Sequence, residues 1–211
     1  VRGFIAPIAL DPNDPNLLYA GTNYLWRRDD TKAGPDAWNA DSPHLGDQML
    51  AVDDGQDSLT YIAIAPSDSN RIYTGSQEGQ LWMSTDKGEH WSQIDAGLPK
   101  YWITSIAIHP SNPNTIVVSL SGTASKDGTP HPGHVWICDD THAPSVKWRR
   151  ITGSGLGLLP NIPVNAIALD PSSPSSIYYA GTDLGFFASK DGGVSWQDAS
   201  TSLGLPNVQV N

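Results

Sequence analysis

One stretch constrains the fold most, and it occurs twice, at residues 82–91 (WMSTDKGEHW) and 187–196 (FASKDGGVSW). Both copies read aromatic-x-Ser-x-Asp-x-Gly-x-x-Trp. The alternating aromatic-x-Ser pattern predicts a strand. The Asp-x-Gly segment predicts a tight turn whose N–H groups donate hydrogen bonds to the aspartate carboxylate. We therefore interpret each copy as a β-hairpin with a locally stabilised tip. The residues given this structural role are Ser84, Asp86, Gly88 and Trp91, and Ser189, Asp191, Gly193 and Trp196.

A second motif occurs four times and precedes each predicted hairpin. Each copy reads as an alternating strand, a turn rich in Pro, Asn, Ser and Asp, and a second strand. The copies begin at Ile8, Ile62, Ile106 and Ile167. Their marker prolines Pro12, Pro66, Pro110 and Pro171 follow one another at intervals of 54, 44 and 61 residues. Periods of this size are typical of four-stranded propeller blades.

We predict an all-β propeller of four-stranded antiparallel blades, at about residues 1–41, 59–96, 103–152 and 163–199. Residues 205–211 (LPNVQVN) repeat the segment that leads into the fourth blade, LPNIPVN at 159–165. We therefore expect them to start a further blade, and the chain to be an open arc of a larger propeller. The remaining blades, or a second copy of the chain, are the expected partners of its two ends. Trp82, Trp91 and Trp196 are expected to be buried between blades.

Two segments resemble a wider form of the hairpin. Trp26 and Trp136 each begin Trp-x-x-Asp-Asp-Thr-x-Ala, with a second Trp twelve positions on instead of nine. Asp30 and Asp140 are expected to cap turns. A cation site is the alternative, although one or two carboxylates coordinate a metal poorly. No metal or cofactor is predicted.

Composition excludes some function classes. The net charge is −10 with only 12 Lys plus Arg, so no basic stripe is available for nucleic acid. No apolar run reaches membrane-spanning length. The single cysteine, Cys138, lies in an apolar strand pattern and is expected to be a buried structural thiol.

The hairpin motif resembles the Asp-box, or BNR, repeat of sialidase-like β-propellers. Residues 11–22 (DPNDPNLLYAGT) are similar to the Asp-Pro-x-x-Pro-x-x-x-Tyr-Ala-Gly-Thr pattern of xyloglucanase-type glycoside hydrolases. Sortilin-type receptors and photosystem II assembly factors have similar blades. These resemblances imply a propeller from an exported, bacterial protein that is secreted, periplasmic or on the cell surface.

Two functions fit this resemblance. The first is a non-enzymatic binding or scaffold propeller for a protein, peptide or glycan. The alternative is a fragment of a xyloglucanase-like hydrolase acting on polysaccharide. We favour the first, non-enzymatic function, and a glycoside hydrolase is the activity expected if the chain is part of an enzyme.

The candidate ligand-binding residues lie in loops, where function concentrates. They are Tyr24, Tyr101, Trp102 and Asp183. Tyr101 and Trp102 have a competing interpretation as packing between blades. The acidic loop with Asp53, Asp54 and Asp57 is expected to be solvated or to bind a cation weakly.

The xyloglucanase resemblance also implies catalytic aspartates in Thr-Asp-x-Gly loops, and residues 182–185 match that segment. In a hydrolase, Asp183 and Glu78 would be the expected acids, because two carboxylates must flank the glycosidic bond.

Overall fold

The structure is a computed structural model that describes residues 6–29, 57–122, 134–200, 204 and 210. Regular structure in these residues is β-strand except for one short 3-10 helix, η2 (Gly155–Gly157). The strands form four antiparallel sheets in chain order, which we call blades 1 to 4. The predicted all-β fold is therefore confirmed.

The described part of blade 1 has three strands, and blades 2 to 4 have four each. Blade 1 contains β1 (Ile8–Leu10), β2 (Leu17–Gly21) and β3 (Leu25–Asp29). Blade 2 contains β4 (Leu59–Ala65), β5 (Asp68–Ser76), β6 (Leu81–Ser84) and β7 (Ser92–Gln93). Blade 3 contains β8 (Ile103–Ile108), β9 (Ile116–Leu120), β10 (Val135–Cys138) and β11 (Arg149–Arg150). Blade 4 contains β12 (Val164–Leu169), β13 (Tyr178–Thr182), β14 (Gly185–Ser189) and β15 (Gln197–Asp198).

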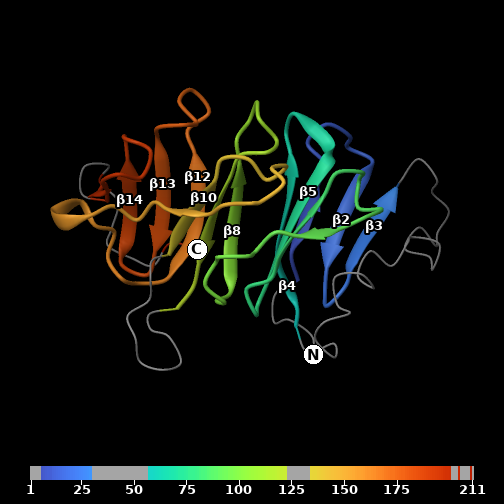
Figure 1. Ribbon diagram of the computed structural model, residues 1–211, viewed down its shortest axis with the longest axis horizontal. Coiled ribbons are helices and arrows are strands. Elements are labelled where there is room, and N and C mark those ends of the chain that lie inside the picture. The colour runs from blue at the N-terminus through green and yellow to red at the C-terminus, as the bar shows by residue number, and fades with distance from the viewer. Residues whose placement is uncertain (1–5, 30–56, 123–133, 201–203, 205–209, 211) are drawn as a thin grey trace.

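The four blades stand side by side, with blades 1 and 4 at opposite ends of the row (Figure 1). Within each blade every strand pairs with the next one along the chain. The first strands of successive blades contact one another, β1 with β4, β4 with β8 and β8 with β12. First strands therefore form the inner edge of an open arc, and later strands lie progressively further out.

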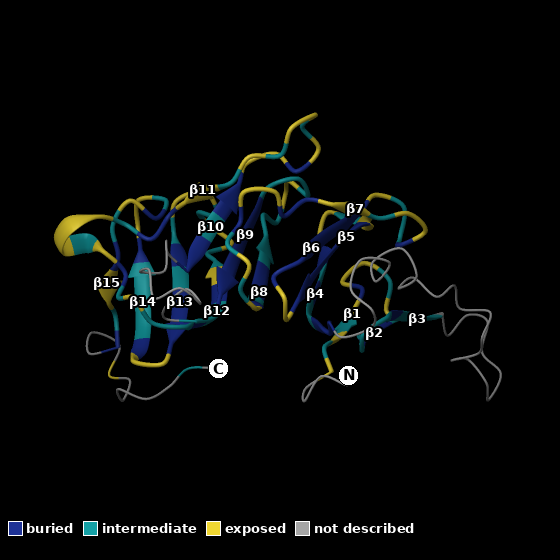
Figure 2. Cartoon of the chain, turned by 60° about the horizontal axis from the view of Figure 1, so that its bottom comes forward, coloured by how far each residue is buried: buried dark blue, intermediate teal, exposed yellow. Residues whose placement is uncertain are grey.

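Apolar side chains pack in the three junctions between blades, and many residues of these strands are buried, dark blue in Figure 2. Each junction has its own cluster, because alternate residues of a strand point to the two faces of its blade. Between blades 2 and 3, for example, Tyr73 and Leu81 meet Ile106 and Val118. Burying such a side chain contributes about 1.5–3 kcal/mol, so the junctions hold the arc together.

The tryptophans occupy these junctions further out. Trp82 and Trp196 are buried, with 7% and 3% of their surfaces exposed, as predicted. The indole N–H of Trp196 donates to the carbonyl of Ile151, which follows the last strand of blade 3. Trp91 is partly buried and packs against the cluster between blades 1 and 2, and its indole N–H donates to the Gly88 carbonyl within its own turn.

Glycines permit the closest approach at the inner edge. A Cβ on Gly75 of β5 would lie 2.4 Å from the side chain of Ile103, the first residue of the next blade. A Cβ on Gly21 of β2 would similarly lie 3.0 Å from the Leu59 side chain. Successive blades therefore meet through a glycine and the apolar residue that opens the next first strand.

Val210 packs against Gly181 of blade 4 as Leu59 packs against Gly21 and Ile103 against Gly75. A Cβ on Gly181 would lie 2.7 Å from its side chain. Its N–H donates to the Thr182 carbonyl at 3.0 Å, as the N–H of Leu59 donates to Thr22 at 2.7 Å. Its contacts are those of the residue that opens the next blade.

The structure also bears on the predictions for Cys138, for Asp30 and Asp140, and for membrane spans. Cys138 is a buried thiol, and burial raises its pKa. Asp140 caps its turn by accepting the His142 N–H at 2.9 Å, whereas Asp30 lies outside the described residues. Within the described ranges, no helix is long and apolar enough to cross a membrane.

Candidate functional site

The antiparallel hairpins sort the connections into two edges of the arc. One edge carries the turns between second and third strands together with the connections between blades, and we call it the loop edge. The other carries the turns between first and second strands and between third and fourth strands, and we call it the turn edge. The predicted ligand residues belong to the loop edge, and the repeated Ser-x-Asp-x-Gly segments belong to the turn edge.

At the turn edge, Ser84 and Asp86 organise the loop between β6 and β7. The buried Ser84 hydroxyl donates to the Asp86 carboxylate at 2.8 Å and accepts the Gly88 N–H at 2.8 Å. Asp86 also accepts the His90 N–H at 2.9 Å and contacts its imidazole at 2.6 Å. Partial burial acts to raise the pKa of Asp86, but the hydrogen bonds from His90 and Ser84 outweigh it and lower the pKa.

The second copy repeats this geometry. Ser189 donates to Asp191 at 2.8 Å and accepts the Gly193 N–H at 2.9 Å. The side chain and N–H of Ser195 both donate to Asp191, and these bonds lower its pKa. Both carboxylates are thus hydrogen-bonded within their own turns.

At the loop edge, a hydroxyl residue at or just after the end of the second strand accepts a hydrogen bond from a backbone N–H of the turn in blades 1, 2 and 4. Thr22 accepts the Tyr24 N–H at 3.1 Å, and the indole N–H of Trp26 also donates to it, at 3.1 Å. Thr182 does the same for Leu184. The ring of Tyr24 meets that of Trp26 edge to face, with centroids 6.3 Å apart. Tyr24 is therefore held as one half of an aromatic pair on blade 1.

Tyr101 and Trp102 lie in the connection between blades 2 and 3. Tyr101 is half-buried, packs against the junction cluster and lies over two positive-φ glycines, Gly79 and Gly122. A Cβ on Gly79 would lie within about 3 Å of the Tyr101 backbone, and a Cβ on Gly122 would lie about 3 Å from the Tyr101 ring. Trp102 is 42% exposed. Tyr101 therefore has a packing role, and Trp102 is the aromatic surface available to a ligand.

The acidic candidates are dispersed along the loop edge. Asp183 is exposed between β13 and β14 and accepts the Asn165 amide at 2.9 Å. Glu78 is exposed in the turn between β5 and β6, so blade 3 separates the two acids in the row. Asp57 is buried, which corrects the expectation for this residue of the acidic loop, and accepts the N–H groups of Ser58 and Glu78; Asp53 and Asp54 lie outside the described residues. The described residues contain no cluster of three or more potential metal ligands.

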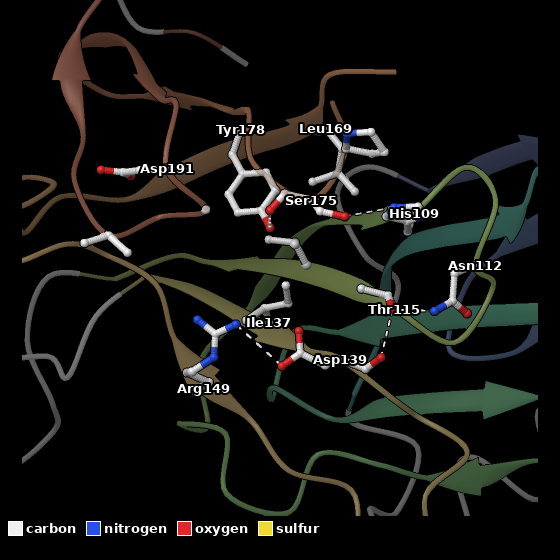
Figure 3. A pocket seen from close by; sticks show the side chains of 14 residues that line it. His109, Asn112, Thr115, Ile137, Asp139, Arg149, Leu169, Ser175, Tyr178 and Asp191 are labelled. Atoms are coloured by element: carbon white, nitrogen blue, oxygen red, sulfur yellow. Dashed lines mark hydrogen bonds and ion pairs between the residues drawn. The ribbon is translucent and has the colours of Figure 1, made fainter. Parts of the chain in front are cut away.

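A site that the sequence motifs do not single out is a pocket at the turn edge between blades 3 and 4 (Figure 3). Charged and apolar residues from both blades line it. The only sequence signal for it is Val117, which stands where the other three blades carry a tyrosine.

The profile of the DUF6242 beta propeller domain matches residues 44–210. The chain belongs to this family. The match extends from blade 2 through blade 4 to Val210, so the family relationship covers most of the arc.

Curated relatives of this DUF6242 propeller are xyloglucanases. An oligoxyloglucan-reducing end-specific xyloglucanase of Emericella nidulans is 22% identical over 92% of the chain. Xyloglucanases of Hypocrea jecorina and a Paenibacillus species are 24% and 26% identical over 92% and 95% of it. The chain spans 24%, 25% and 21% of these three proteins, so it corresponds to about a quarter of each.

Solved structures with a similar fold include GH74 enzymes. An ancestral GH74 enzyme matches 93% of the chain with a TM-score of 0.60 and 21% identity. The GH74 xyloglucanase of Xanthomonas campestris matches 98% with a TM-score of 0.63 and 16% identity. The chain covers 24% and 31% of these structures, respectively. They share its propeller architecture.

Proposed function

We propose that the chain is a segment of a xyloglucanase-like glycoside hydrolase and that its loop edge binds a polysaccharide. The observation that carries this proposal is that the curated relatives described above are xyloglucanases matched over nearly the whole chain. It favours the hydrolase alternative over a non-enzymatic scaffold. We assign the two repeated turns, by their Ser-Asp hydrogen bonds, as Asp-boxes with a structural role.

Trp102 and Asp183 are the residues of the loop edge best suited to a glycan. Trp102 offers an exposed ring on which the apolar face of a sugar can stack, and Asp183 offers an exposed carboxylate for hydroxyl groups. A polysaccharide does not cross a membrane, so a protein acting on it works outside the cell or in the periplasm. Secretion or display at the cell surface is therefore part of the proposal.

Catalysis needs a second carboxylate about 5–9.5 Å from the first. Asp183 and Glu78 are on blades separated by blade 3. We therefore propose Asp183 as the carboxylate that this chain contributes, with its partner supplied by another part of the whole protein.

Affinity electrophoresis of the full 211-residue chain in gels containing xyloglucan tests the binding proposal. We expect retardation by xyloglucan, weakened about tenfold in Trp102→Ala because a stacking surface is lost. Leu156→Ala, which removes another exposed apolar side chain, is the control and should bind as the parent does. Unretarded migration of the parent chain would contradict glycan binding.

A further inference from the structure

The pocket between blades 3 and 4 has a volume of about 360 Å³. Its apolar part is formed by Val117 and Ile137 of blade 3 and by Leu169 and Tyr178 of blade 4. Arg149 and Asp139 lie on one side of it, and His109 and Ser175 lie on the other (Figure 3). Ligand pockets typically have volumes of about 300–1,000 Å³, so this one suits a single small ring.

The pocket lies where a valine replaces the tyrosine of the other blades. Tyr19, Tyr73 and Val117 each pair with an alanine of the first strand of their blade and face the next blade. Tyr19 and Tyr73 are fully buried and fill the first two junctions. The Tyr73 hydroxyl bonds across its junction to the Pro113 carbonyl at 2.7 Å and to Thr141 at 2.6 Å. Val117 has neither the ring nor the hydroxyl, and the pocket lies beside it at the turn edge of an otherwise packed junction.

Tyr178 closes one wall of the pocket without filling it. In the preceding blades its position is taken by Leu18, Ile72 and Ile116. Its ring is buried, and its hydroxyl donates to the Ser175 carbonyl at 3.1 Å. The phenol is therefore held against its own turn, and an aromatic wall faces the cavity.

The rim carries a donor and an acceptor next to each other. A guanidinium nitrogen of Arg149 lies 3.5 Å from a carboxylate oxygen of Asp139, and their side chains are 57% and 70% exposed. So long and exposed a contact is weak, and both groups are free to turn toward a ligand. Asp191 is held by Ser195, and its carboxylate points away from the pocket (Figure 3).

This balance of charge selects the class of ligand. An anion would meet Asp139, and a cation would meet Arg149. A neutral ligand with neighbouring hydroxyls satisfies both, because one hydroxyl donates to the carboxylate while the next accepts from the guanidinium. The apolar wall requires that the ligand also present a nonpolar face.

We propose that this pocket is a second glycan-binding site, which takes one sugar residue between Asp139 and Arg149 and against the wall of Ile137 and Tyr178. The choice of a sugar over another neutral polyol rests on the proposed function. The site is at the turn edge, so it is separate from the Trp102 surface at the loop edge. It would hold a side branch or a chain end of the polysaccharide.

The test is a titration of the full chain carrying Trp102→Ala, followed by ¹H–¹⁵N NMR, with D-glucose, D-xylose, D-galactose and a xyloglucan heptasaccharide as probes. We expect saturable shifts of amides around Ile137 and Tyr178 with at least one of these sugars. Arg149→Ala should weaken that binding about tenfold. Val117→Tyr should abolish it by restoring the ring found in the other junctions. Arg150→Ala, the adjacent arginine on β11, should leave it unchanged.

Sugar binding that is unaffected by Arg149→Ala overturns the proposal, even if Val117→Tyr fails to fold. Absence of sugar shifts in the Trp102→Ala chain also overturns it, and retained affinity of the parent chain for xyloglucan would then leave the proposed function standing. A stronger response to inorganic phosphate than to any sugar overturns the ligand class.

Discussion

The hydroxyl groups of Ser84 and Ser189 each connect a strand end to the following turn. Each donates to an aspartate and accepts the N–H of a glycine four residues on. Both serines are about 1% exposed, so water cannot replace the lost partner. At this scale the repeated motif is a hydrogen-bond arrangement, and its polar atoms serve the fold.

Ser84→Ala should lower the free energy of unfolding by about 1–3 kcal/mol, because the Gly88 N–H is left buried without its acceptor. Urea denaturation followed by circular dichroism measures the change. Ser92→Ala, in the exposed strand β7, is the matched control and should stay within about 0.5 kcal/mol of the parent chain. Equal effects of the two substitutions would show that the Ser84 hydroxyl is dispensable.

The turn aspartates make stability depend on pH. The pKa of Asp191 is lowered from 3.8 by its bonds from Ser195, so the folded state favours the carboxylate. Its contribution is present above the unfolded pKa and is lost as pH falls through the folded value. The Tm difference between the parent chain and Asp191→Asn should thus be full above about pH 5 and shrink at acidic pH. A constant difference down to pH 2.5 would contradict this.

At the scale of elements, the sequence predicts the hairpins and the strand order well because the signals are local. Alternation, Pro-rich turns and the Asp-x-Gly segment each act within a few residues, and they predict an all-β fold of repeated blades. Contacts between blades are not local. The partial burial of Trp91, the burial of Asp57 and the packing of Tyr101 over Gly79 depend on neighbouring segments that the motif itself does not specify.

The pocket illustrates the same limit. Val117 stands in an unremarkable apolar strand, and its significance emerges only when the register places it opposite Ala107, as Tyr73 is placed opposite Ala63. Arg149 and Asp139 are ten positions apart in sequence, with a long turn between them. Aligning the four blades by residue would have revealed the missing tyrosine, but not the charges beside it.

Gly75→Ala tests how blades 2 and 3 fit together. The added methyl would lie 2.4 Å from Ile103, so strand β8 must shift. Overpacking of this kind costs about 1–3 kcal/mol, which thermal denaturation would show as a lower Tm. An unchanged Tm would mean that the junction is looser than the structure indicates.

At the scale of the whole molecule, the two end blades expose faces that are buried elsewhere in the arc. Ile8 and Leu10 of blade 1 are 70% and 56% exposed, whereas the equivalent Ile62 and Ile64 of blade 2 are 6% and 8% exposed. At the other end, Tyr179 stacks on Phe186 at 5.6 Å, and both rings are partly exposed. Each end therefore presents the apolar half of a blade junction.

The isolated 211-residue chain should consequently associate, because exposed apolar faces seek partners. Light scattering over a concentration series should show dimers or larger species. Leu10→Lys places a charge in the exposed face of blade 1 and should shift the equilibrium toward monomer. A parent chain that is monomeric at every concentration would contradict the prediction.

The glycine contacts at the inner edge also have a geometric consequence. Gly21 and Gly75 let successive first strands approach closely, while the rings of Trp82 and Trp196 keep neighbouring sheets apart further out. A narrow spacing inside and a wide one outside make each blade a wedge with a definite angle. A full turn divided by that angle gives the number of blades that closes a ring. A methyl group on one of these glycines would widen the inner spacing, reduce the angle and favour a ring with more blades.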